Sequence, residues 1–164
     1  MRRLSLMCAL GLVACSEPEG TDAPSLDSLV ETGGCSDLTM YAASEDGDLL
    51  LVVRYDGELA TTAYEEEVPV TVEVDAEGTV ELVQGREVLN YYCNDVLEQG
   101  AQEVETTWEA VSGSLTLTVT NRGDGEYSAD ADAELLDVHL QAEGAEDVHI
   151  DRMDWSAVVG WWPG

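Results

Sequence analysis

The sequence predicts an all-β fold, an antiparallel β-sandwich or flattened barrel of about eight to ten strands. Apolar and polar residues alternate along much of the chain, which is the pattern of a strand with one buried face. Turn-forming pairs such as Asp46-Gly47 and Asp56-Gly57 recur at intervals of roughly ten residues, as expected for strands joined by tight turns. The one helical turn we expect is Asp154–Gly160, with an Asp before it and a Gly after it.

Four segments carry the clearest strand patterns. Leu49–Val53 is continuously apolar, as expected for a strand that is covered on both faces. Valines occupy alternate positions over Val68–Val74, where Pro69 favours an edge strand or a strand that begins there. Leucine or valine alternates with polar residues over Leu115–Val119 and Leu136–Leu140. These patterns support one antiparallel domain.

Acidic residues dominate the charge. The 164 residues include 35 Asp and Glu but only six Arg and no Lys, for a formal charge of −29. This balance excludes a nucleic-acid binder that neutralises phosphates, because such a surface needs clustered cations. Three interpretations of the acidic surface stay open: a solvated surface, adaptation to a saline habitat, and a cation-binding surface.

The N-terminus has the features of a secretory signal peptide. Two arginines precede an apolar run of about ten residues, too short for a helix that spans a bilayer core of about 30 Å. The run ends in Leu12-Val13-Ala14-Cys15, which resembles the lipobox of bacterial lipoproteins. The resemblance implies cleavage before Cys15, a lipid on its thiol and anchoring in the cell envelope, and Ser16 then implies the outer membrane. The alternative is an ordinary signal peptide with Cys15 as a bystander.

Three regions follow from this interpretation. Residues 1–14 are the signal peptide, residues 15–34 are the lipidated Cys15 with a flexible acidic tether, and residues 35–164 are the β domain. The tether is expected because its segment holds two Pro, three Gly and five acidic residues and few large apolar side chains to bury. A short helix at Leu26–Val30 is the alternative.

One disulfide is expected in the exported domain. Cys8 leaves with the signal peptide and Cys15 carries the lipid, so Cys35 and Cys93 remain under oxidising conditions. Their bond would close a long loop and contribute about 4 kcal/mol in the chain-entropy model. Two buried free thiols or a metal pair are the alternatives.

Motifs for catalysis are scarce. The chain has no HExxH, GxSxG, P-loop or GxGxxG motif. It has two His and no expected free thiol, so a Ser-His or Cys-His mechanism has few candidates. We therefore expect no catalytic residues and no enzyme. A hydrolase that uses a pair of carboxylates is the less favoured alternative, because the many acidic residues single out no pair.

Two groups of residues are candidates for ligand binding. Asp124 lies in a Gly-rich turn, and Asp130 and Asp132 share one face of a predicted strand, so we consider calcium, which needs several oxygen ligands. A solvent-facing acidic strand is the alternative. Trp161 and Trp162 are candidate platforms for a carbohydrate, and packing onto the end of the core is the alternative.

The two histidines are predicted to face each other across a hairpin. The register that pairs apolar with apolar residues between 136–141 and 147–152 also sets the two His opposite each other. Directly opposed Cβ atoms in a sheet lie about 5 Å apart, close enough for zinc or a similar ion to bind between them. A polar outer face without a metal is the alternative. The candidate ligands are His139, His149, Asp137 and Asp151.

The sequence therefore predicts an exported, lipid-anchored, non-catalytic β domain that serves as a surface or periplasmic interaction or structural module. Its expected partners are the membrane, through the N-terminal lipid, and a protein or glycan that the sequence does not identify. A calcium- or carbohydrate-binding module is the alternative. No cofactor is expected other than calcium or zinc at the candidate sites.

Replacement of Cys15 tests the predicted anchor. Cys15→Ala removes the thiol that the lipid would modify. Each buried methylene of a lipid contributes about 0.8 kcal/mol to anchoring. Without the lipid, we therefore expect the protein to move from the membrane to the soluble fraction. Fractionation and immunoblotting measure this. Cys8→Ala is the matched control and should stay with membranes. An unmodified Cys15 thiol in the intact mass of the wild type contradicts the prediction.

Overall fold

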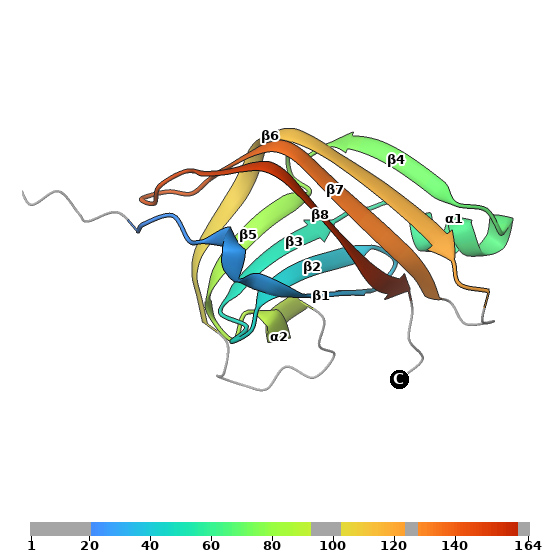
Figure 1. Cartoon of the computed structure of the whole chain (residues 1–164), viewed down its shortest axis with the longest axis horizontal. Helices are drawn as coiled ribbons and strands as arrows, with labels where there is room; N and C mark the ends of the chain where they lie inside the picture. Colours follow the sequence, from blue (N-terminus) through green and yellow to red (C-terminus); the bar gives the residue numbers. More distant parts are fainter. Residues whose placement is uncertain (1–20, 93–102, 124–127, 161–164) are drawn as a thin grey trace, which may run out of the picture.

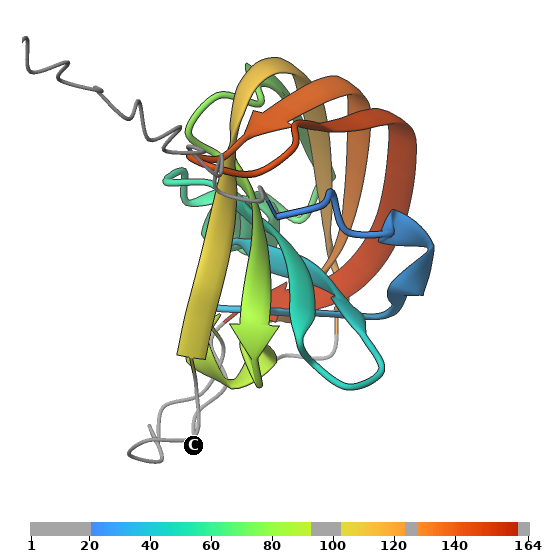
Figure 2. The ribbon, with the colours of Figure 1, turned by 90° about the vertical axis from the view of Figure 1, so that its left-hand side faces the viewer.

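The computed structural model describes residues 21–92, 103–123 and 128–160, and it confirms the all-β fold. Eight antiparallel strands form a nearly closed barrel (Figures 1 and 2). The strands are β1 (Leu29–Cys35), β2 (Thr39–Ser44), β3 (Leu49–Arg54), β4 (Val70–Asp75), β5 (Val80–Arg86), β6 (Glu103–Asn121), β7 (Ser128–Gln141) and β8 (Val148–Gly160). The helical segments are a 3-10 turn (Leu26–Ser28), α1 (Leu59–Glu66) and α2 (Leu89–Tyr92).

A single sheet wraps around the core in the order β1-β2-β3-β5-β6-β7-β8. Strand β6 is long, and it pairs with β5 along its first half and with β4 along its second half. The first and last strands meet where the Gly160 N–H donates to the Ser36 carbonyl oxygen at 2.6 Å. Gly34 permits this approach, because a Cβ there would lie 2.8 Å from the carbonyl oxygen of Val158.

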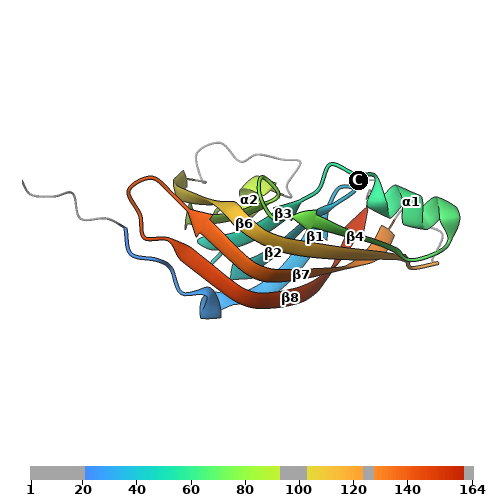
Figure 3. The same cartoon turned by 90° about the horizontal axis from the view of Figure 1, so that it is seen from above.

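Apolar side chains fill the interior of the barrel. Trp108, Met40, Leu51 and Leu82 are fully buried, and they supply the bulk that a chain without Phe needs for its core. Helix α1 lies at one end of the barrel, where its buried apolar side chains join the same core (Figure 3). This filled core leaves the polar candidate residues on the outer surface.

The sheet bends at a corner that crosses three neighbouring strands (Figure 1). Alternation of buried and exposed residues breaks at 111–114 in β6, 136–137 in β7 and 151–152 in β8, and we call these residues the sheet corner. The pairing of β6 with β7 shifts register on both sides of Ser112, and Gly113 has a φ of 119°. These are features of β-bulges, which bend and twist a sheet.

The predicted helical turn at Asp154–Gly160 is wrong, because this segment continues β8. Trp155, Ala157 and Val159 alternate into the core. Each pairs with a buried alanine of β7, and these alanines leave room for the larger side chains of Trp155 and Val159. Long-range packing therefore overrides the local signals for a helix.

Two further differences concern the N-terminal region and a helix. Strand β1 begins at Leu29, within the range 15–34 expected to be a tether, and Leu26 and Leu29 pack against the core. Helix α1 is not predicted, because its eight residues cover only about two turns. Asp37 helps to fix α1 by accepting a hydrogen bond from the Thr61 N–H at 3.1 Å.

Among the described residues, no helix has the length and apolar character that a membrane span requires.

Substitution of Gly113 tests the sheet corner. A Cβ at this residue would lie 2.6 Å from the Cα of Val138, and the φ of 119° is unfavourable for any L side chain. We expect Gly113→Ala to reduce the free energy of unfolding by about 3 kcal/mol, measured by urea denaturation. Gly78→Ala is the matched control, because Gly78 has a φ of 74° and open space around it; it should cost about 1 kcal/mol. Equal losses for the two variants contradict this account of the corner.

Candidate metal centre

The predicted pairing of the two histidines is confirmed. Strands β7 and β8 pair with His139 opposite His149, flanked by the expected apolar pairs. The imidazole rings stack with their centroids 4.2 Å apart and an interplanar angle of 17°. Their side chains are 50% and 41% exposed. The neighbouring Val138 and Ile150 are buried in the core, and because strand residues alternate between faces, they hold both imidazoles on the outer face.

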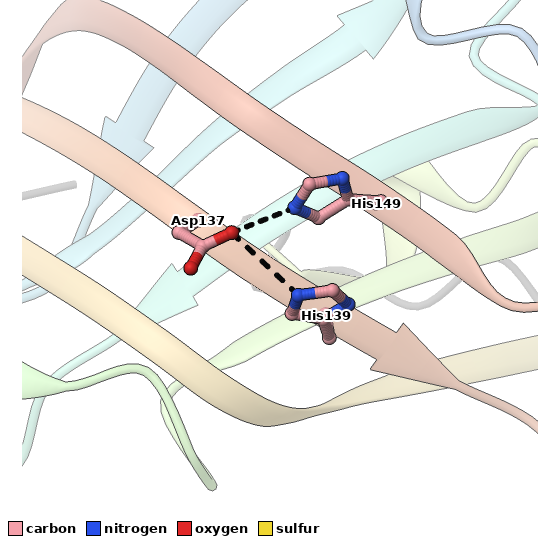
Figure 4. Close-up of side chains that lie close together, drawn as sticks. All are labelled: Asp137, His139 and His149. Atoms are coloured by element: carbon pink, nitrogen blue, oxygen red, sulfur yellow. Dashed lines mark hydrogen bonds and ion pairs between the residues drawn. The ribbon is translucent and has the colours of Figure 1, made fainter.

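Asp137 turns its carboxylate toward both imidazole rings (Figure 4). Its Oδ1 atom lies 2.9 Å from Nε2 of His149 and 3.6 Å from Nε2 of His139. In a regular strand, residues 137 and 139 would be about 7 Å apart on one face. Asp137 instead has a φ of 53°, a left-handed conformation that is uncommon outside glycine and concentrates at functional sites. The bulge at the sheet corner thus accompanies the convergence of the three side chains.

The ligand atoms of Asp137, His139 and His149 all lie within 4.8 Å of one another. Zinc ligands at about 2.0 Å in a tetrahedral arrangement are about 3.3 Å apart, so rotation of these exposed side chains must bring the ligand atoms closer together to enclose an ion. Two imidazole nitrogens and a carboxylate oxygen form a donor set that suits zinc, copper or nickel. Three protein ligands leave a position for water or an external ligand. We call these three residues the metal triad.

Asp151 lies beside the metal triad and contacts the other ring nitrogen of His149. Its Oδ1 atom is 3.5 Å from Nδ1, and its side chain is 96% exposed. Without an ion, the contact with Asp137 is a hydrogen bond that His149 donates from Nε2. If a metal ion replaced that proton, a carboxylate at Nδ1 would favour the tautomer with the remaining proton on Nδ1, which leaves the Nε2 lone pair for the ion. The structure therefore leaves Asp151 beside His149 and outside the converging group of ligand atoms.

The pKa of the Asp137 carboxyl group is lowered from its ordinary value. The hydrogen bond from His149 is the largest cause; partial desolvation opposes it, and attraction to both imidazoles adds to it. The ionised carboxylate is the form that binds a metal ion. Asp137 is therefore ready to act as a ligand at neutral pH.

The residues considered for calcium do not join the metal triad. Asp130 and Asp132 lie on the outer face of β7, as predicted, where Arg122 pairs with Asp130 at 3.6 Å and the Ser156 hydroxyl donates to Asp132. Both line a surface hollow of about 630 Å³, to which Tyr41 also contributes. Among the described residues, only the metal triad brings three or more potential metal-ligating side chains together.

Several candidate residues lie outside the described part of the chain: Cys15, Cys93, Asp124, Trp161 and Trp162. Cys35 ends β1 with its Sγ atom 3.5 Å from the carbonyl oxygen of Tyr92, which directly precedes Cys93. This position supports the expected Cys35–Cys93 bond, which stays a prediction.

No protein-family model, no curated protein and no solved structure matches the chain. Functional inference therefore rests on the residues and their geometry. The sequence names the three residues that converge here, together with Asp151, but it does not identify Gly113 as the residue that permits the sheet corner beside them. The sequence feature that could have indicated the bend is the segment Ser112-Gly113-Ser114, which interrupts the apolar alternation before Leu115.

The acid titration of Asp137 tests the contact with His149. We expect the pKa of Asp137 to lie below the ordinary value of 3.8 in the wild type and to rise toward it in His149→Ala, because His149 supplies the main hydrogen bond. The lowered folded-state pKa means that Asp137 stabilises the fold above about pH 3.8 and loses this effect as the pH falls through the folded-state value. NMR of the carboxyl carbon measures the titration. An unchanged pKa of Asp137 in His149→Ala refutes the contact.

Proposed function

We propose that the protein is an exported, lipid-anchored, non-catalytic module of the bacterial cell envelope that binds a divalent transition metal ion, with zinc as the reference ion. Asp137, His139 and His149 are the proposed ligands. The observation that carries the proposal is the convergence of their three ligand atoms within 4.8 Å on one surface. The anchor is supported by the lipobox resemblance that ends at Cys15.

The donor set favours a transition metal over calcium. Calcium takes six to eight oxygen ligands, whereas two of the three donors here are imidazole nitrogens, which suit zinc, copper and nickel. The strongly negative chain adds a long-range attraction, because 35 acidic residues raise the local concentration of cations. The triad then supplies the selective contacts at one point of this surface.

Exposure of the metal triad favours binding over catalysis. The side chains of His149, His139 and Asp137 are 41%, 50% and 75% exposed. Electrostatic stabilisation of a transition state is strongest in a site from which water is excluded. An outer corner of a filled barrel suits the capture or display of an ion, or its use as a link to a partner.

Zinc titration of matched variants tests the proposal. We expect isothermal calorimetry to give one specific site in the wild type and at least tenfold weaker binding in His139→Ala, His149→Ala and Asp137→Asn, because each loses a ligand. Asp151→Asn should weaken binding about tenfold, as expected for a residue that orients a ligand. At a hundred times the dissociation constant, zinc should stabilise the wild type by about 2.7 kcal/mol.

Asp132→Asn is the control for the general effect of negative charge, because Asp132 lies on the same strand face and outside the triad. It should bind zinc as the wild type does. Equal affinity in the wild type and in a variant that lacks both histidines would overturn the metal site. Membrane fractionation of the Cys15→Ala protein tests the anchor independently.

A further inference from the structure

We infer that the β7–β8 hairpin end of the barrel faces a phospholipid headgroup surface, with the metal triad on this membrane-facing part. The inference rests on the lipid anchor at Cys15 that is part of the proposed function. It follows from where the described N-terminal segment joins the barrel, at Thr21, and from how few residues separate Thr21 from Cys15.

The N-terminal segment is fastened to the turn between β7 and β8. The Thr21 N–H donates to the Gly144 carbonyl oxygen at 3.2 Å, and the Glu146 N–H donates to the Thr21 carbonyl oxygen at 3.0 Å. The two bonds form a bridge between Thr21 and Ala145. The Ala23 N–H adds a contact of 3.5 Å with the Glu146 carboxylate. We call residues 21–25 the N-terminal strap.

The turn that holds the strap is itself tied to the core. The indole N–H of Trp108, which is fully buried, donates to the Glu146 carbonyl oxygen at 2.8 Å. Ala142 and Ala145, on the same turn, pack against the core, as does Leu26 just after the strap. The strap is therefore attached to the core of the barrel through this turn.

The chain between the anchor and the strap is short. Thr21 is six residues after Cys15, and six residues span at most about 20 Å. A free tether up to residue 34 would have allowed the barrel to turn in any direction. With the strap in place, the hairpin end stays within about 20 Å of the lipid, whereas α1 and the end of β8 lie at the far end of the long strands (Figure 1).

The charge of this end indicates what it can contact. Asp22, Glu143, Glu146 and Asp147 are all exposed here, so the surface is repelled by anionic lipids and suits a zwitterionic headgroup layer. The covalent lipid, and not the protein surface, must then hold the molecule on the membrane.

The metal triad shares this end of the barrel. His139 and His149 are each five residues from Gly144 along their strands, a distance of about 16 Å at the rise of a β-strand. An ion bound by the triad would therefore lie on the side of the barrel nearer the membrane, while the opposite end projects away from it.

Energy transfer to the membrane tests the orientation. In the full lipidated protein, a donor dye is attached to Glu143→Cys at the hairpin or to Glu65→Cys on α1, both exposed positions. Each protein is reconstituted into phosphatidylcholine vesicles that carry acceptor-labelled headgroups. We expect at least twofold greater transfer from position 143 than from position 65.

A strap variant provides the matched comparison. Thr21→Pro removes the N–H that bonds to Gly144, so the difference in transfer between the two dye positions should shrink, whereas Thr21→Ser keeps the bond and should preserve it. Equal or reversed transfer in vesicle-bound wild type overturns the orientation, and an undiminished difference in Thr21→Pro overturns the role of the strap. Wild-type protein that does not remain with the vesicles would instead overturn the anchor, and zinc affinity reports separately on the metal site.

Discussion

Closure of the barrel requires the sheet to bend at Gly113, and the proposed metal centre depends on that bend. Any side chain at Gly113 would meet the backbone of Val138, so only glycine lets β6 and β7 approach at the corner. Beside it, Asp137 adopts a left-handed conformation. The same irregularity that turns the sheet therefore brings a carboxylate to two imidazoles, whose positions the neighbouring apolar pairs fix.

Electrostatics explains why a cation is favoured at this corner. Acidic residues outnumber Arg by 35 to six in the chain, and the Arg side chains of the described part pair with carboxylates other than Asp137. Arg152, for example, lies 2.9 Å from Glu134 and 3.7 Å from Asp154. Asp137 contacts imidazoles instead, and a bound divalent ion would neutralise it together with part of the surrounding repulsion. Metal binding and stability of the acidic barrel are thus expected to rise together.

The sequence predicts the parts of the structure that depend on local apolar pattern. The β7–β8 register follows from pairing apolar residues across a short turn, so His139 meets His149 as expected. Features that depend on distant partners or on backbone conformation are not predicted. Trp155 belongs to a strand because the alanines of β7 make room for its side chain. Leu136 is expected on the buried face, but its side chain is 50% exposed, because the irregular backbone at Asp137 changes which residues of β7 face the core.

The coordination of a bound ion tests whether Asp137, His139 and His149 form a metal centre. X-ray absorption of the protein loaded with one equivalent of zinc reports the donor atoms and their distances. We expect two imidazole nitrogens and a carboxylate oxygen at about 2.0 to 2.2 Å, with the multiple-scattering signal of imidazole lost when His139 and His149 are both replaced by Ala. A shell of oxygen donors alone in the wild type would contradict it, because zinc would then be held by the general acidic surface and not by the corner of the barrel.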